Sequence, residues 1–82
     1  IAVIRISGPD AFVAGERLAG TLPRPRTAAL RRLRDSEGAL LDDALLLCFE
    51  APRSATGERT VELHCHGGRA VVAKVLDLLG AM

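Results

Sequence analysis

Polar and apolar residues alternate strictly from Thr60 to His66, and this pattern constrains the fold more than any other part of the chain. Successive side chains of a β-strand point to opposite sides of a sheet. We expect the apolar face to pack into a core and the polar face to carry any binding or catalysis. The apolar face consists of Val61, Leu63 and Cys65, and the polar face of Glu62, His64 and His66.

Two helices are predicted, one near each end of the chain, and each has an apolar stripe that can lie against a sheet. The first follows a strand expected over residues 1–6, begins at Ser7 or Gly8, and stops at Gly20. Its stripe consists of Phe12, Val13, Leu18 and Ala19. The second helix follows Gly67-Gly68, and its stripe consists of Val71, Val72, Val75, Leu76 and Leu79.

A turn-rich tetrad, Asp35-Ser36-Glu37-Gly38, separates two short runs in the middle of the chain. We therefore predict a hairpin in which Ala28–Arg34 and Ala44–Glu50 pair as antiparallel strands. The second strand is expected to be central and buried on both faces, because Leu41 to Phe49 is almost continuously apolar. Ala28–Arg34 also has helical propensity, so propensity alone leaves its state open.

These elements predict one small α+β domain over residues 1–82, in which a mixed or antiparallel sheet is packed by two or more helices. A chain of this length buries only about 60–65% of its unfolded surface, so a partner is expected to add stability. The net charge of +1 does not favour a dedicated nucleic-acid or membrane-surface domain. No apolar run reaches the roughly 18 residues of a membrane span. The chain begins inside an apolar segment without Met, so we expect a fragment of a longer protein.

His64 and His66 allow a metal site with Glu62 as a third ligand, because alternate residues of a strand share a face. No other Cys/His pair at zinc spacing supports that site, and Cys65 points to the opposite face. The same geometry disfavours a nucleophilic Cys–His pair. Histidines on a half-exposed sheet face are the simpler alternative. Neither glycine-rich nucleotide motif, GxxxxGK[ST] or GxGxxG, is present.

Five arginines lie close together in the sequence: Arg24, Arg26, Arg31, Arg32 and Arg34. Such a cluster is most often a solvated surface, and RNA binding also calls for aromatic residues that stack on bases. The chain has two Phe and no Trp or Tyr, so direct RNA contact is the less favoured alternative. Cys48 and Cys65 lie in apolar runs, which predicts buried free thiols in a cytosolic protein.

Several motifs, in order along the chain, resemble the N-terminal domain of the MnmE (TrmE) family of bacterial tRNA-modification GTPases. Each motif alone is weak, but the ordered set spans essentially the whole chain. Two positions depart from the family pattern, because Ala55 replaces the usual aromatic residue and Arg59 the usual acidic one. The motifs are Ile4-Arg5-Ile6-Ser7-Gly8, Pro23-Arg24-Pro25-Arg26, Leu41-Asp42, Ala51-Pro52-Arg53-Ser54, Thr56-Gly57-Glu58 and His66-Gly67-Gly68.

The resemblance implies a fold like that of tetrahydrofolate-binding domains, a constitutive homodimer and a cytoplasmic location. It assigns Arg5 and Glu62 to the binding of 5-formyltetrahydrofolate or 5,10-methylenetetrahydrofolate. It also makes Ala28–Arg34 a strand. The implied parent is a GTPase that acts with MnmG in carboxymethylaminomethyl modification of the wobble uridine of tRNA. Its GTP, Mg and K sites belong to a G domain outside this chain. The helical domain of the family also lies outside this chain. No catalytic residue, metal site or membrane partner is therefore expected here.

The residues themselves agree with the resemblance at Glu62. A pterin ring presents an N–H and an amino group side by side, and one carboxylate can accept both. Arg5 ends a short apolar strand and either reaches solvent or faces a ligand, such as a folate carbonyl or carboxylate. Two alternatives remain open: a dimerisation module without a ligand, and a metal-binding module built on His64 and His66.

Overall fold

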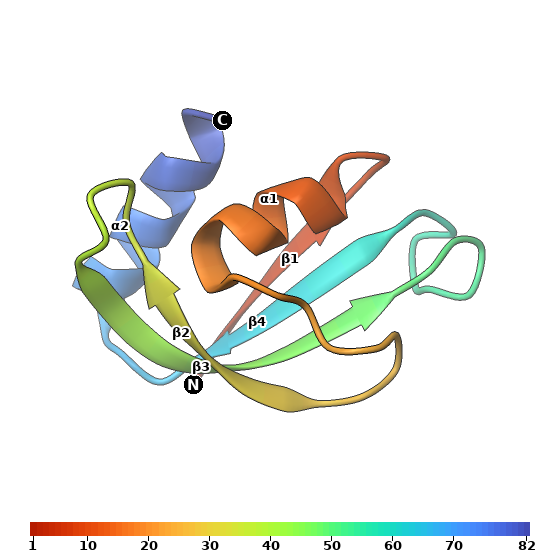
Figure 1. The fold of residues 1–82 in the computed structure, drawn as a ribbon, viewed down its shortest axis with the longest axis horizontal. Helices are drawn as coiled ribbons and strands as arrows, with labels where there is room; N and C mark the ends of the chain where they lie inside the picture. The colour runs from red at the N-terminus through yellow and green to blue at the C-terminus, as the bar shows by residue number, and fades with distance from the viewer.

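Four antiparallel strands form one sheet, and both helices lie on the same side of it (Figure 1). This arrangement comes from a computed structural model that describes residues 1–82. The strand order β1-β4-β3-β2 places β4 and β3 in the middle. The predicted α+β class is confirmed, with a wholly antiparallel sheet. The elements are β1 (Ala2–Ser7), α1 (Ala11–Ala19), β2 (Ala29–Arg34), β3 (Leu40–Phe49), β4 (Thr60–Cys65) and α2 (Arg69–Gly80).

The strand β4 is the centre of the core, as its alternation predicts. Leu63 pairs with Ile4 of β1 on one side and with Leu46 of β3 on the other. Val61, Leu63 and Cys65 are all 0% exposed. Cys48 and Cys65 are free and buried, as predicted. The apolar side of β4 therefore faces the helices.

The predicted hairpin is confirmed, because β2 and β3 pair as antiparallel strands. Its turn is held by the Asp35 carboxylate, whose Oδ1 accepts hydrogen bonds from the N–H groups of Glu37 and Ala39, each at 2.9 Å. Gly38 completes the turn with φ of 86°, a conformation that glycine adopts without steric cost.

Two details of the expected β3 are wrong. The strand begins at Leu40 rather than at Ala44, and it is buried on one face only. Ala44 and Leu46 are 0% exposed, whereas Leu45 between them is 36% exposed. In a two-layer domain a central strand has a neighbour on each side but a packed layer on only one face. The continuous apolar run therefore did not mean burial on both faces.

The helix faces differ from the predicted stripes at two positions. Val13 of α1 is 50% exposed, and Leu76 of α2 is 52% exposed. Residues of an α-helix are about 100° apart, so a face centred on Val75 includes the positions three and four residues later and leaves Leu76 outside. The observed stripes are Ala11, Phe12, Gly15, Leu18 and Ala19 in α1, and Val71, Val72, Val75, Leu78 and Leu79 in α2.

The start of α1 and the end of β4 also differ from the prediction. The N-cap of α1 is Asp10, not Ser7 or Gly8. His66 lies beyond the end of β4 at Cys65, so it is not part of the polar row of the strand. The Asp42 carboxylate draws the chain away there, because its Oδ2 accepts hydrogen bonds from the N–H groups of His66 and Gly67 at 2.8 and 3.2 Å.

No helix covers the second face of the sheet, which we call the open face. The strand register aligns a row across all four strands on it, from Val3 through His64 and Leu45 to Leu30. Val3 is 53% and Leu30 63% exposed. The open face therefore presents apolar side chains to solvent around a polar centre. Neither helix has the length and apolar character needed to cross a bilayer.

Candidate functional site

The structure brings together the two site residues predicted from the sequence. Arg5 of β1 lies directly opposite Glu62 of β4 in the strand register. The Nε and Nη2 atoms of Arg5 both donate hydrogen bonds to Oε2 of Glu62, at 3.2 and 2.8 Å. The Arg5 side chain is 48% exposed and that of Glu62 only 16%, so the carboxylate is the more enclosed partner.

A third side chain completes this polar group. The Nε2 atom of His64 lies 3.3 Å from Oε1 of Glu62. The hydrogen bond from Arg5 holds the pKa of the Glu62 carboxyl below its ordinary value; burial opposes this shift, and His64 adds to it. Glu62 is therefore a fixed, ionised acceptor at neutral pH. We call Arg5, Glu62 and His64 the carboxylate triad.

Glu62 lines a solvent-open cavity of about 410 Å³. The cavity lies on the open face, where β3 and β4 meet the loop of residues 50–59. Its volume falls within the roughly 300–1,000 Å³ of typical small-molecule sites. Arg5 does not line the cavity and supports Glu62 from the adjacent edge strand. The lining residues are Arg26, Phe49, Pro52, Arg53, Ser54, Ala55, Thr60 and Glu62.

The loop of residues 50–59, which forms one wall of the cavity, is tied to the sheet by hydroxyl groups. The Ser7 and Thr56 hydroxyl oxygens are 2.7 Å apart, and those of Thr56 and Thr60 are 3.1 Å apart. Thr60 also donates to the carbonyl of Glu58 at 3.0 Å and is 1% exposed. These contacts give Thr56 of the loop motif a structural role and use Glu58 through its backbone carbonyl.

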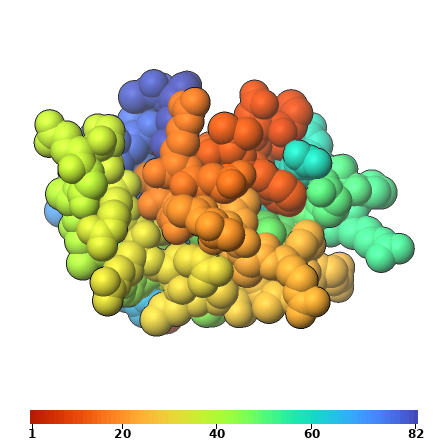
Figure 2. All heavy atoms as spheres, viewed as in Figure 1, coloured from red at the N-terminus to blue at the C-terminus, as the bar shows by residue number.

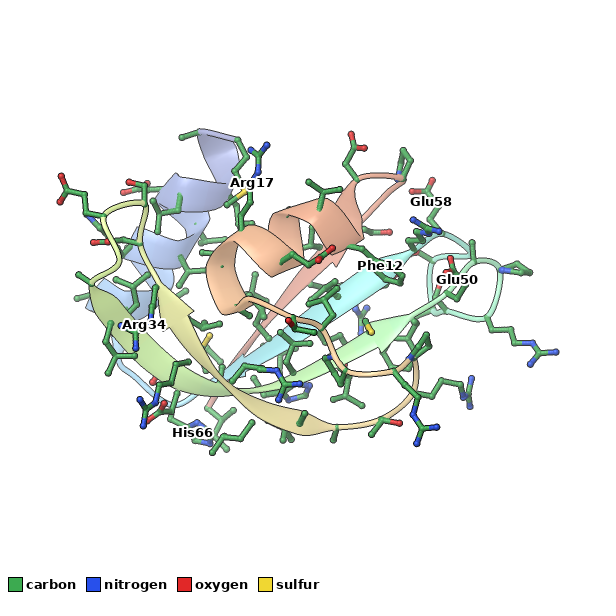
Figure 3. All side chains as sticks on the ribbon, viewed as in Figure 1. Phe12, Arg17, Arg34, Glu50, Glu58 and His66 are labelled. Carbon is green, nitrogen blue, oxygen red and sulfur yellow. The ribbon has the colours of Figure 1, made fainter.

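Arg59, one of the two departures from the family pattern, joins the loop to α1. It donates to Oε1 of Glu50 at 2.7 Å, and its guanidinium lies 4.9 Å from the centre of the Phe12 ring. Figure 3 shows Phe12, Glu50 and Glu58 together at this end of the molecule, and Figure 2 shows the loop projecting there beyond the body of the domain. The charge of Arg59 is thus paired within the chain.

Sequence reasoning missed most of the cavity. The sequence predicts Phe49 only as part of a strand, and Arg26 only as a member of a solvated arginine cluster and of a family motif, without a binding role. Arg26 reaches the site because its N–H donates to the carbonyl of Cys48 at 2.8 Å, beside the end of β3. That contact joins residues far apart in the sequence. The only local signal is the proline that precedes Arg26 in the motif Pro23-Arg24-Pro25-Arg26.

The metal alternative gains no support from the structure. His64 contacts Glu62, whereas Nδ1 of His66 lies 2.8 Å from the carbonyl oxygen of Asp43. Figure 3 shows His66 at the opposite end of the sheet from Glu50 and Glu58. No three His, Cys, Asp or Glu side chains gather closely enough to hold a metal ion.

A larger hollow, of about 530 Å³, lies on the other side of the sheet between α1 and α2. Its polar side chains are Ser7, Asp10 and Arg17, and the last of these points into the space beside α2 (Figure 3). It contains neither Arg5 nor Glu62 and no aromatic residue. The smaller cavity beside Glu62 is therefore the better candidate site.

The whole chain, residues 1–82, matches the family model described as GTP-binding protein TrmE N-terminus. The chain belongs to this family. The match confirms the resemblance drawn from the ordered motifs, including Ile4-Arg5-Ile6-Ser7-Gly8 and His66-Gly67-Gly68.

The names of individual relatives are consistent with the TrmE N-terminal family. A protein of Erythrobacter litoralis named tRNA modification GTPase MnmE is 62% identical over 82 residues, covering 100% of this chain and 19% of that protein. A protein of the same name from Sphingopyxis alaskensis is 58% identical over 79 residues, covering 96% and 19%. One from Rhizobium meliloti is 53% identical over 81 residues, covering 99% and 18%. The chain spans about a fifth of the length of these curated relatives.

Proposed function

We propose that this chain holds a reduced folate and forms the homodimer contact of a tRNA-modification GTPase. The observation that carries the folate assignment is the Glu62 carboxylate. It is kept ionised by Arg5 and lines an open cavity of about 410 Å³. Family membership supports the wider role, because the relatives are named as tRNA modification GTPases.

The cavity residues fit a folate in their chemistry. A carboxylate offers about four lone-pair sites. Arg5 uses Oε2 of Glu62 twice and His64 approaches Oε1 once, which leaves capacity for a further donor. A ligand that displaces His64 gains a second. Phe49 adds an aromatic surface beside Glu62, suited to a planar ring.

Arg5 has two roles in this proposal. It keeps Glu62 charged and oriented through two hydrogen bonds. Its remaining terminal nitrogen, Nη1, makes no hydrogen bond within the chain and is free for a carbonyl or carboxylate oxygen of the ligand. The bound 5-formyl- or 5,10-methylenetetrahydrofolate would supply one-carbon chemistry, and the chain would bind and orient it.

The open face supports the homodimer. Val3, Leu45 and Leu30 expose apolar side chains in one row across the sheet, with 53%, 36% and 63% of each residue accessible. A small domain gains stability by covering such a face, and a symmetric pair of identical chains is the commonest solution. We infer that a second copy covers this row.

The wider function lies outside the 82 residues. We propose that GTP hydrolysis, with its Mg and K, resides elsewhere in the parent protein and that this chain alone has no catalytic activity. The parent would act in the cytoplasm with MnmG on the wobble uridine of tRNA.

Calorimetric titration of the intact protein with 5-formyltetrahydrofolate tests the folate assignment. Glu62→Gln keeps the shape of the side chain but cannot accept two hydrogen bonds as a charged group. The expected loss is about 2–3 kcal/mol, or roughly 30- to 150-fold in affinity. Glu50→Gln is the matched control, because it removes an ion pair of similar length, 2.7 Å to Arg59, outside the cavity.

The outcomes separate the two candidate functions. Unchanged folate affinity in a folded Glu62→Gln variant would contradict the assignment. A wild-type protein that is dimeric by light scattering but takes up no folate would instead favour the dimerisation module without a ligand.

A further inference from the structure

Arg26 has a backbone conformation that its residue type disfavours. The N–H of Thr27 donates to the carbonyl of Arg24 at 3.1 Å, which closes a turn with Pro25 second and Arg26 third. Arg26 has φ of 66° and is the only non-glycine residue of the chain with a positive φ. The third position of a turn with Pro second and positive φ third is normally Gly or Asn. An L side chain there is strained, and such strain is found preferentially at functional sites.

The backbone contacts of the turn do not require an arginine. Arg26 is anchored by its N–H, which donates to the carbonyl of Cys48 at 2.8 Å. Glycine offers the same N–H and adopts this φ freely. What glycine lacks is the side chain. The side chain of Arg26 lines the cavity of Glu62 and makes no ion pair or hydrogen bond within the chain.

The lining of the cavity contains an anion, an aromatic surface and two cations. Glu62 is an anionic acceptor, and Phe49 is an apolar surface in the same lining. Arg26 and Arg53 are cations that also line the cavity, and neither has an acidic partner within 4.0 Å. A ligand that suits this lining has a hydrogen-bond donor edge, a planar body and an anionic end.

We propose that Arg26 is an anion-binding residue of this cavity and takes the carboxylate end of the ligand whose donor edge meets Glu62. The proposal rests on the proposed folate function and adds to it the direction of the ligand. A guanidinium presents parallel N–H groups that match the two oxygens of a carboxylate. Arg53 provides a second cation in the same lining.

The decisive variant is Arg26→Gly. Relief of backbone strain should keep or raise the Tm, whereas loss of the side chain should lower the affinity for the ligand. We expect the Tm of the intact protein to stay level or rise. We expect its affinity for 5-formyltetrahydrofolate to fall by about 10- to 100-fold, the usual effect of losing a charge-assisted hydrogen bond. Arg26→Lys keeps a cation and should retain most of the affinity. Arg24→Ala is the matched control, because Arg24 belongs to the same turn but does not line the cavity.

A second ligand distinguishes this inference from the folate assignment itself. A tetrahydropterin without the benzoylglutamate group has the donor edge but no carboxylate. Arg26→Gly should leave its affinity unchanged, whereas Glu62→Gln should weaken both ligands.

Two results would overturn the role of Arg26 and leave the folate function intact. One is folate affinity unchanged in Arg26→Gly while Glu62→Gln loses it. The other is equal loss of folate and tetrahydropterin in Arg26→Gly. A wild-type protein that binds neither ligand would overturn both proposals.

Discussion

The two faces of the sheet are built from the same strands and differ in almost every property. On the covered face, Val61 and Leu63 of β4 are 0% exposed beneath the helices. On the open face, Glu62 of the same strand lies between Arg5 and His64 and borders a cavity. One residue along the strand separates the core from the candidate site.

The energetics of the two faces differ in the same way. Complete burial of one Leu side chain contributes about 1.5–3 kcal/mol. A half-exposed ion pair such as Arg5–Glu62 contributes about 0–1 kcal/mol. Stability therefore comes mainly from the covered face. Substitutions on the open face can change binding or association without unfolding the domain.

The largest expected effect is on the covered face. Leu63→Ala should lower the free energy of unfolding by about 2–5 kcal/mol, because it leaves a cavity in the core. Leu30→Ala, at a residue that is 63% exposed on the open face, should change it by no more than about 0.5 kcal/mol. Urea denaturation at low protein concentration, where the chain is monomeric, measures both. Similar losses in the two variants would mean that the faces are equally packed.

The second-largest expected effect is on the association of two copies of the chain. Leu45→Lys places a charge in the apolar row of the open face, where we infer that a second copy binds. The dimer should dissociate at least about tenfold more readily, because burying an unpaired charge costs more than 1.4 kcal/mol. Light scattering over a range of micromolar concentrations measures this change.

Leu76→Lys is the control for association. Leu76 is 52% exposed on the outer side of α2, away from the open face. The substitution Leu76→Lys should leave the dimer unchanged. If both variants dissociate the dimer, or neither does, the interface lies elsewhere.

The smallest effect concerns pH and the carboxylate triad. Because Arg5 lowers the pKa of Glu62 in the folded chain, the ion pair stabilises the fold above the ordinary carboxyl pKa of 4.5. This contribution is lost as pH falls below 4.5 through the lower folded pKa. At pH 7 the free energy of unfolding of the wild type should exceed that of Glu62→Gln by up to about 1 kcal/mol, and this difference should disappear in acid.

Denaturation at a series of pH values measures that gap. Arg5→Gln in both backgrounds supplies the control, because without Arg5 the difference at pH 7 should largely disappear. A gap that widens as pH falls would show that Glu62 does not stabilise the fold as an ion-paired carboxylate.

The sequence by itself determined the local elements. The alternation of Thr60 to His66 predicted a strand with one buried side, since the period of two is a property of the backbone. The Asp35–Gly38 turn predicted the hairpin, because Asp and Gly provide the contacts and the φ that the turn needs. The family was also accessible from the ordered motifs, which single out Arg5 and Glu62, whereas the direct contact between these two side chains comes from the strand register of the structure.

Only the tertiary structure decided which faces are covered and which residues meet at the cavity. Whether β3 is buried on one side or two depends on where both helices return to the sheet, and no residue of β3 encodes that. Arg26 joins Phe49 and Glu62 through a hydrogen bond to Cys48, a contact between residues more than twenty positions apart. Local patterns report the period of a strand and the chemistry of a turn. They carry no information on which distant segments pack side by side, because that follows from the burial of the whole chain at once.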